Sequence, residues 1–287
     1  MTSSQTILAC FFLLVVILAS SPASTTKSNS LPESETLPLV SFGTAGGVQE
    51  ADVRYALEMG FKSFDTAMAT EWYDEDAVSR AVADVPRDEV FITSKVHPRD
   101  LGFSATKAAG ARSAAKFGGY VDVLLLHYSH CWGDLCDDGA SDGASDAHAW
   151  RESWRAIEEL REEGKVLVGA GVSNFHPLEL RELGKLARDG GGEVRVVQDW
   201  CDPFHQAKEQ RAFCASLLNC TFQAYSSLGG QWLHQPPYRN VVMESAVLHR
   251  IAENHGVNIP TLVLSWQLQL GIGEKVVCTG NATFARR

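Results

Sequence analysis

A carboxylate, an ammonium and an imidazole each end a short apolar run of the sequence: Asp65, Lys95 and His127. A phenol, that of Tyr73, follows eight residues after the carboxylate in the stretch FDTAMATEWYDEDAV. An ammonium favours the phenolate form of a neighbouring tyrosine and so lowers its pKa, and a carboxylate keeps that ammonium charged. A phenol in such surroundings is a usable proton donor at neutral pH.

These residue types suit the reduction of a carbonyl group. Hydride addition leaves an alkoxide, which needs a proton donor in place as its charge develops. We expect Tyr73 to be that donor, supported by Lys95 and Asp65, and His127 to orient the carbonyl oxygen as a neutral hydrogen-bonding group. The hydride must come from a cofactor, because no side chain supplies one.

Polar side chains also mark the ends of the later apolar runs. Ser173 and Asn174 follow the fifth run, Gln198 ends the sixth, and Tyr225 ends the seventh. Each of these residues has an ordinary alternative role as a cap or a packing residue. The first four have such roles too: Asp65 could be a cap, Tyr73 a packing residue, Lys95 a solvated lysine at a strand end, and His127 a plain core or surface histidine. Six run ends of this kind in succession indicate one shared site.

The elements that must position these residues are short apolar strands alternating with amphipathic helices. The runs cover residues 37–43, 61–65, 90–95, 121–127, 166–172, 194–198, 221–225 and 275–279. Alternation of this kind predicts parallel βα units, and near-continuous apolar strands indicate burial on both faces. We predict a single (β/α)8 barrel, whose strands open at their carboxyl ends onto one catalytic face. A doubly wound open sheet is the alternative, although no G-x-G-x-x-G follows the first run.

Several motifs resemble the aldo-keto reductase superfamily, in order and over residues 37–280. They read FDTA and WYDEDAV, FITSKV, VDVLLLH, GKVLVGAGVSNF, QDWCDPFHQ and QAYSSLG. The resemblance implies a catalytic tetrad of Asp65, Tyr73, Lys95 and His127, and NADPH as cofactor with NADH as the alternative. It also implies that the nicotinamide carboxamide bonds Ser173, Asn174 and Gln198, that Tyr225 stacks on the ring, and that Ser226 and Leu228 line the phosphate path.

The sequence departs from the family's pattern in three places. The family commonly places its tyrosine five residues after the aspartate, where this chain has Thr70, so either Trp72 or Tyr73 could take that position. Val197-Gln198 replaces the usual Asn-Gln pair. The ending VVCTGNATFARR lacks the Lys-Ser…Arg element that holds a 2′-phosphate, so we expect a barrel without its last helix and C-terminal loop.

The first residues differ in kind from the rest of the chain. An apolar run from Ile7 to Ala19 is followed by small residues, as in a secretory signal peptide. We predict a signal or signal-like segment over 1–24, a disordered leader over 25–36 and the barrel domain over 37–287. A secretory or extracellular location follows if the segment is cleaved. An uncleaved anchor, which alone would place the protein at a membrane, and a bipartite organelle-targeting sequence are the alternatives.

Two of the cysteines could form a disulfide in an oxidising compartment. Cys131 and Cys136 could bridge a loop, whereas four others read as buried thiols: Cys201, Cys214, Cys220 and Cys278. Their spacing predicts no metal site. Two glycosylation sequons begin at residues 219 and 281, and a tandem GASD repeat within 137–147 reads as a flexible acidic insertion.

The function we expect is reduction of a small-molecule aldehyde or ketone. The net charge of −10 argues against nucleic acid as a partner. A non-catalytic nicotinamide-binding or regulatory subunit on the same fold is the alternative, favoured by the shifted tyrosine and the altered C-terminus.

Overall fold

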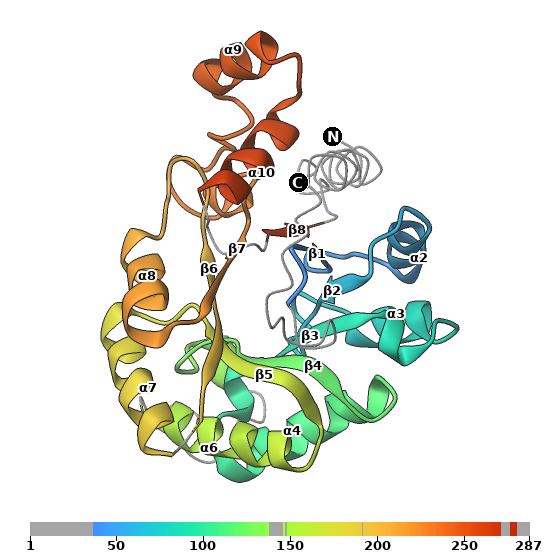
Figure 1. Ribbon diagram of the computed structural model, residues 1–287, viewed down its shortest axis with the longest axis vertical. Coiled ribbons are helices and arrows are strands. Elements are labelled where there is room, and N and C mark those ends of the chain that lie inside the picture. The colour runs from blue at the N-terminus through green and yellow to red at the C-terminus, as the bar shows by residue number, and fades with distance from the viewer. Residues whose placement is uncertain (1–36, 138–145, 147, 191, 271–275, 280–287) are drawn as a thin grey trace, which may run out of the picture.

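Eight parallel strands close into a barrel in the computed structural model (Figure 1), which describes residues 37–137, 146, 148–190, 192–270 and 276–279. The strands are β1 Val40–Gly43, β2 Ser63–Asp65, β3 Phe91–Val96, β4 Val121–Leu126, β5 Val166–Ser173, β6 Val194–Trp200, β7 Thr221–Tyr225 and β8 Val276–Thr279. Each pairs with the next in chain order, and β8 pairs with β1. The prediction of a (β/α)8 barrel is confirmed.

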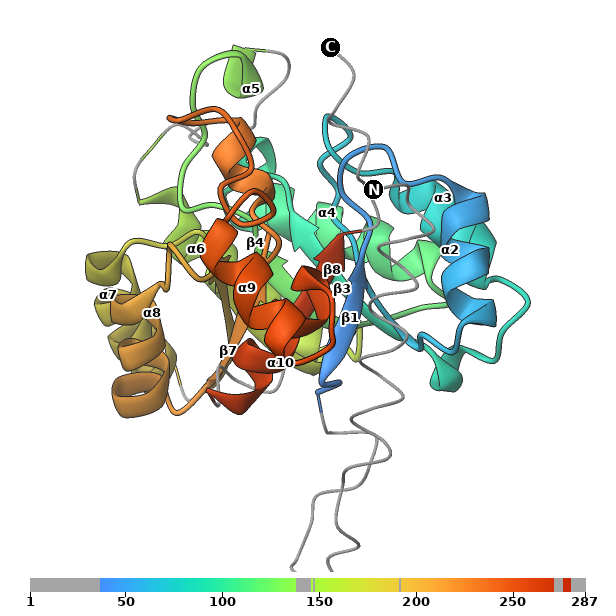
Figure 2. The same ribbon diagram turned by 90° about the horizontal axis from the view of Figure 1, so that it is seen from above.

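Helices surround the strands on the outside of the barrel (Figures 1 and 2). The α-helices are α2 Glu50–Glu58, α3 Glu75–Val82, α4 Phe103–Lys116, α5 Asp134–Asp137, α6 Ala149–Glu162, α7 Pro177–Asp189, α8 Lys208–Phe213, α9 Ala246–Asn254 and α10 Ile259–Gln269. Shorter turns are η2 Arg87–Glu89, η3 Pro98–Asp100, the π-helical η4 Cys214–Leu218 and η5 Gly230–Leu233. In the described chain, no helix has the length and apolar character needed to cross a membrane.

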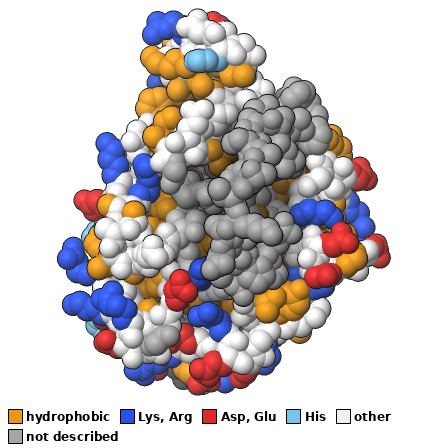
Figure 3. Space-filling view, viewed as in Figure 1, with side chains coloured by type: hydrophobic (Ala, Val, Ile, Leu, Met, Phe, Trp, Pro, Cys, Tyr) orange, Lys and Arg blue, Asp and Glu red, His pale blue; other side chains and the backbone are white. Residues whose placement is uncertain are grey.

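The sequence pattern explains how these elements pack. Every residue of β4 is buried, as expected for a parallel strand covered on both faces. Helix α6 buries Trp150, Trp154, Ile157 and Leu160, whose spacing places them on one face. Around the periphery, lysines, arginines and carboxylates are interspersed on the face shown in Figure 3. The core is therefore the sheet together with the inward faces of its helices.

The described chain contains two disulfides, of which the sequence offered one as a possibility. Cys131 and Cys136 are bonded, as the sequence suggested. The expectation that Cys214 and Cys220 are thiols is wrong, because they are bonded too, with Cα atoms 5.0 Å apart. The π-helical turn after Phe213 and the left-handed backbone of Asn219 (φ 48°) bring the chain back on itself. Cys201 is a free, buried thiol, as predicted.

Several predictions fall on residues outside the described ranges. They are the targeting segment 1–24, the leader 25–36, nearly all of the acidic insertion, the sequon at 281 and the expected loss of a closing helix after residue 279. The side chain of Cys278 also lies outside the description.

Candidate active site

A buried ion pair joins the carboxyl ends of β2 and β3. Lys95 Nζ lies 2.5 Å from Asp65 Oδ1 and donates a second hydrogen bond to the carbonyl oxygen of Thr66, at 3.0 Å. Neither charged side chain is more than 2% exposed. Burial alone would lower the pKa of Lys95, but attraction to Asp65 and then to Tyr73 outweighs it and raises that pKa. The ammonium is therefore charged inside the barrel.

The phenol of Tyr73 lies next to this ammonium. Its Oη is 3.5 Å from Lys95 Nζ, which also stands 4.8 Å from the centre of the Tyr73 ring. Trp72, the alternative for this position, packs instead against His127, with ring centres 5.6 Å apart. We expected Lys95 to bring the Tyr73 pKa down. Lys95 does act in that direction, but burial is the larger effect, and the pKa is raised. Tyr73 is thus a protonated donor at neutral pH.

His127 follows β4 and lies among the rings of Trp72, Tyr73 and Tyr128. Its ring centre lies 5.8 Å from that of Tyr73 and 4.9 Å from that of Tyr128. The residue is 5% exposed, and its Nδ1 has no hydrogen-bond partner among the described residues. Burial, followed by the nearby ammonium of Lys95, lowers its pKa well below the ordinary value. The imidazole is therefore neutral.

Side chains from β5, β6 and β7 extend this arrangement. Gln198 Nε2 donates to Asp65 Oδ2 at 2.8 Å, and Ser173 Oγ donates to Gln198 Oε1 at 3.4 Å. Asn174 Nδ2 donates to Ser173 Oγ at 3.1 Å, while Tyr225 Oη donates to Asn174 Oδ1 at 2.6 Å. Four of the six predicted cofactor-binding residues thus lie in one network with the ion pair.

A second set of predicted residues lies just beyond β7. Ser226 has a left-handed backbone (φ 51°), and the Leu228 carbonyl accepts a hydrogen bond from Asn240 Nδ2 at 2.8 Å. Between them, the hydroxyl of Ser227 is buried without a hydrogen-bond partner in the described structure. Buried hydroxyls are normally bonded, so an unpaired one beside the expected phosphate path fits an oxygen-rich ligand.

Two residues of the site escaped the sequence analysis. Gln223, inside β7, is 4% exposed and accepts from Gln198 Nε2 at 2.7 Å. The feature of the sequence that could have indicated this residue is a glutamine within the apolar run TFQAY. Asp199 follows Gln198 on β6, and burial raises its pKa to about 6. A carboxylate next to a predicted site residue was visible in the sequence, but its partial burial was not.

Known proteins are similar to this chain over most of its length. The model of the Aldo/keto reductase family matches residues 46–281. A 9,11-endoperoxide prostaglandin H2 reductase of Trypanosoma cruzi is 31% identical over 223 residues, covering 77% of this chain and 69% of that protein. A glyoxal reductase of Bacillus subtilis is 28% identical over 236 residues, covering 79% and 72%. A crystal structure of an aldo/keto reductase from Brucella melitensis superposes with a TM-score of 0.66 at 27% identity, covering 85% of this chain and 84% of that one.

Proposed function

Because the chain belongs to the aldo/keto reductase family and is an NAD(P)H-dependent oxidoreductase, we propose that it reduces a small-molecule aldehyde or ketone with NADPH. Tyr73 is the general acid of this reaction. The observation that carries the proposal is the series Asp65, Lys95 and Tyr73, in which a buried ion pair meets a half-buried phenol, with 2.5 Å and 3.5 Å between successive polar atoms. The preference for NADPH over NADH rests on the family resemblance.

The bound cofactor would supply the hydride, and the chain's own residues handle the proton. Tyr73 stays protonated because burial raises its pKa, so its proton leaves only when a strongly basic alkoxide develops beside it. The Lys95 ammonium then stabilises the phenolate, and Asp65 holds that ammonium in place. Neutral His127 directs the carbonyl oxygen toward the phenol by hydrogen bonding.

The nicotinamide would be held by the groups at the ends of β5, β6 and β7. Both N–H groups of Gln198 already have acceptors, in Asp65 and Gln223. The long bond between Ser173 Oγ and Gln198 Oε1, 3.4 Å, is the most readily exchanged for bonds to a carboxamide. Asn174 and the ring of Tyr225 complete this group. Ser226 and Leu228 would lie along the phosphates.

Two tyrosines beside His127 provide a matched test. Tyr73→Phe removes the phenol next to Lys95, and we expect kcat/KM with a panel of aldehydes to fall by about 10²–10⁴-fold. Tyr128→Phe removes a neighbouring phenol whose pKa burial raises to about 12, and should change kcat/KM only slightly. NADPH binding, followed by quenching of tryptophan emission, should survive in both variants.

Two other outcomes would reject the assignment. Full turnover by Tyr73→Phe would mean that another group donates the proton. Tight NADPH binding without turnover of any aldehyde or ketone by the unaltered protein would favour the regulatory alternative, in which the fold serves only to bind the cofactor.

A further inference from the structure

We infer that Glu71, held by His97 and Arg99, is a positioning residue that fixes Tyr73 against Lys95. This inference rests on the proposed role of Tyr73 as the general acid. Tyr73 comes eight residues after Asp65, instead of the five common in the family. The longer segment between them needs an anchor if the phenol is to meet the ammonium.

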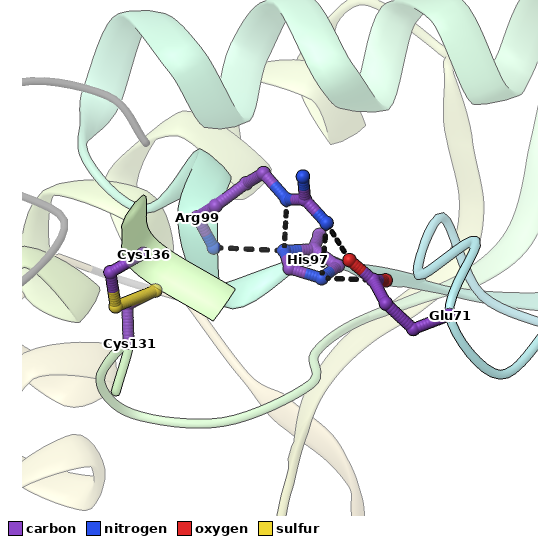
Figure 4. The surroundings of a disulfide bond; sticks show 5 residues. All are labelled: Glu71, His97, Arg99, Cys131 and Cys136. Carbon is purple, nitrogen blue, oxygen red and sulfur yellow. Dashed lines mark hydrogen bonds and ion pairs between the residues drawn. A yellow bond between two sulfur atoms is a disulfide. The ribbon is translucent and has the colours of Figure 1, made fainter. Parts of the chain in front are cut away.

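Both oxygens of the Glu71 carboxylate are engaged by the chain that follows β3 (Figure 4). Oε1 forms an ion pair with Arg99 Nη2, and Oε2 lies 3.1 Å from His97 Nε2. His97 Nδ1 accepts from the backbone N–H of Arg99 at 3.0 Å and from Arg99 Nε at 3.1 Å. Since Nδ1 is an acceptor, Nε2 carries the proton and donates a hydrogen bond to Glu71.

The state of His97 agrees with this pattern of bonds. The residue is 1% exposed, and burial lowers its pKa, opposed by Asp100. A neutral imidazole with one donor and one acceptor fits between a carboxylate and the Arg99 groups. The helical turn η3, which carries Arg99, packs against α5 in the loop closed by the Cys131–Cys136 disulfide. The turn that carries Arg99, and so holds Glu71, is therefore packed against a disulfide-closed loop.

The Glu71 contacts are followed along the chain by further contacts on both sides of Tyr73. Trp72 lies nearly parallel to the His97 ring, with centres 6.4 Å apart, and its carbonyl accepts from the Gly46 N–H at 2.8 Å. Beyond Tyr73, the Asp74 side chain caps α3 by accepting from the Ala77 N–H at 2.8 Å. Tyr73 is thus the one residue between two fixed points, one on each side.

The same short segment of the chain holds Lys95, which contacts the phenol, and His97, which contacts Glu71. Lys95 and His97 are two residues apart, and the Lys95 carbonyl also accepts from the Met68 N–H at 3.1 Å. The segment from Asp65 to Tyr73 is therefore attached along the end of β3 at its start, near its middle and at Glu71. Displacing Glu71 would release the attachment to His97 and Arg99 that precedes the phenol, while leaving the Asp65–Lys95 pair intact.

Glu71→Gln, measured in two backgrounds, tests this role. In the unaltered protein we expect kcat to fall about 10-fold or more, with the KM for NADPH within about twofold. In the Tyr73→Phe background, the same change should cause no further loss, because Glu71 acts through the phenol. Glu50→Gln is the matched control, since Glu50 is also held by two basic side chains, Arg54 and Arg80, on the outer surface.

A second measurement does not depend on turnover. Hydrogen exchange at the amides of Trp72 and Tyr73, both of which donate to the Ala69 carbonyl, should become faster in Glu71→Gln and stay unchanged in Glu50→Gln. Should Glu71→Gln fail to fold, Glu71→Asp keeps the charge, shortens the side chain and should show a smaller effect in the same direction.

The outcomes separate the two proposals. Unchanged kcat and unchanged exchange in the Glu71 variants would overturn the positioning role and leave Tyr73 as the acid. Equal losses from Glu71→Gln with and without the Tyr73 phenol would also overturn it, because a general loss of structure would act independently of that phenol. Full activity of Tyr73→Phe alone would instead remove the function on which the inference rests.

Discussion

Lys95 is charged although its side chain has no exposure to solvent. Such a charge is tolerable only with its partner, because removing one member of a buried ion pair typically costs about 3–5 kcal/mol. A buried pair is itself weak support for stability, which suggests that this one is retained for its effect on Tyr73. A loss of activity in Asp65→Asn could therefore come from lost stability or from lost chemistry. Tyr73→Phe avoids this problem because it leaves the ion pair intact.

His127 should make the stability of the barrel depend on pH. Burial lowers its pKa in the folded protein, so below about pH 6.5 the unfolded chain binds the extra proton and the folded one resists it. Stability should then fall as the pH falls below that value, by at most about 1.4 kcal/mol per pH unit from this residue. Urea unfolding at neutral and mildly acidic pH measures the effect.

Replacement variants isolate that contribution. His127→Gln cannot take up the proton, so its unfolding free energy should decline less between the two pH values than that of the unaltered protein. His255→Gln, at an exposed position after α9, should behave like the unaltered protein. An identical decline in all three proteins would show that His127 is not held neutral by the fold.

At the scale of elements, the strands could be read from the sequence because each is buried on both faces. The run 90–95 predicted β3, observed at Phe91–Val96, and placed Lys95 near its end. That placement indicated the face of the barrel on which the candidate site lies, since parallel strands all open on one side. Local composition was sufficient for this step because burial on both faces leaves a continuous apolar signal.

The contacts between loops could not be predicted in the same way. Glu71 and Arg99 are ordinary surface-type residues in the sequence, and only the path of the backbone brings them together. The Cys214–Cys220 bond likewise depends on a left-handed residue, Asn219, that no apolar pattern marks. The site's inner residues were therefore foreseeable from strand ends, and the groups that brace it were not.

Gly171 is where two strands approach too closely for a side chain. An added Cβ would lie 2.2 Å from the Val196 carbonyl oxygen on β6 and 2.8 Å from the Leu125 side chain. Gly171→Ala should lower the free energy of unfolding by about 1–3 kcal/mol, as expected for an overpacked core. Because Ser173 follows on the same strand, NADPH should also bind more weakly. Urea unfolding and fluorescence titration measure the two effects.

Gly190 supplies the control for that substitution. Its backbone is compatible with any side chain (φ −82°), and an added Cβ would meet its nearest neighbours at 3.4 Å, an ordinary contact. Gly190→Ala should therefore leave stability almost unchanged. If Gly171→Ala also left the free energy of unfolding almost unchanged, β5 and β6 could separate without cost. The close approach at Gly171 would then not constrain the barrel.

At the scale of the whole molecule, the site exists only when the barrel is closed. Its side chains come from six successive strand ends, β2 to β7, and the network crosses from Gln198 on β6 to Asp65 on β2. No smaller part of the chain holds the ion pair and the amide groups together. A ligand that needs all of them must bind the folded state and not the unfolded one.

Cofactor binding should therefore stabilise the entire barrel by mass action. A ligand specific for the folded state adds about 2.7 kcal/mol at a free concentration of 100 Kd, or roughly 5–11 °C in Tm for a chain of this size. NADPH should raise Tm more than NADH at equal concentration. Tyr73→Phe should keep the NADPH shift, because the role proposed for the phenol is proton donation and not cofactor binding. Ser173→Ala should reduce the shift. Equal shifts with both cofactors would refute the NADPH preference, and the absence of a shift with either would reject the nicotinamide site itself.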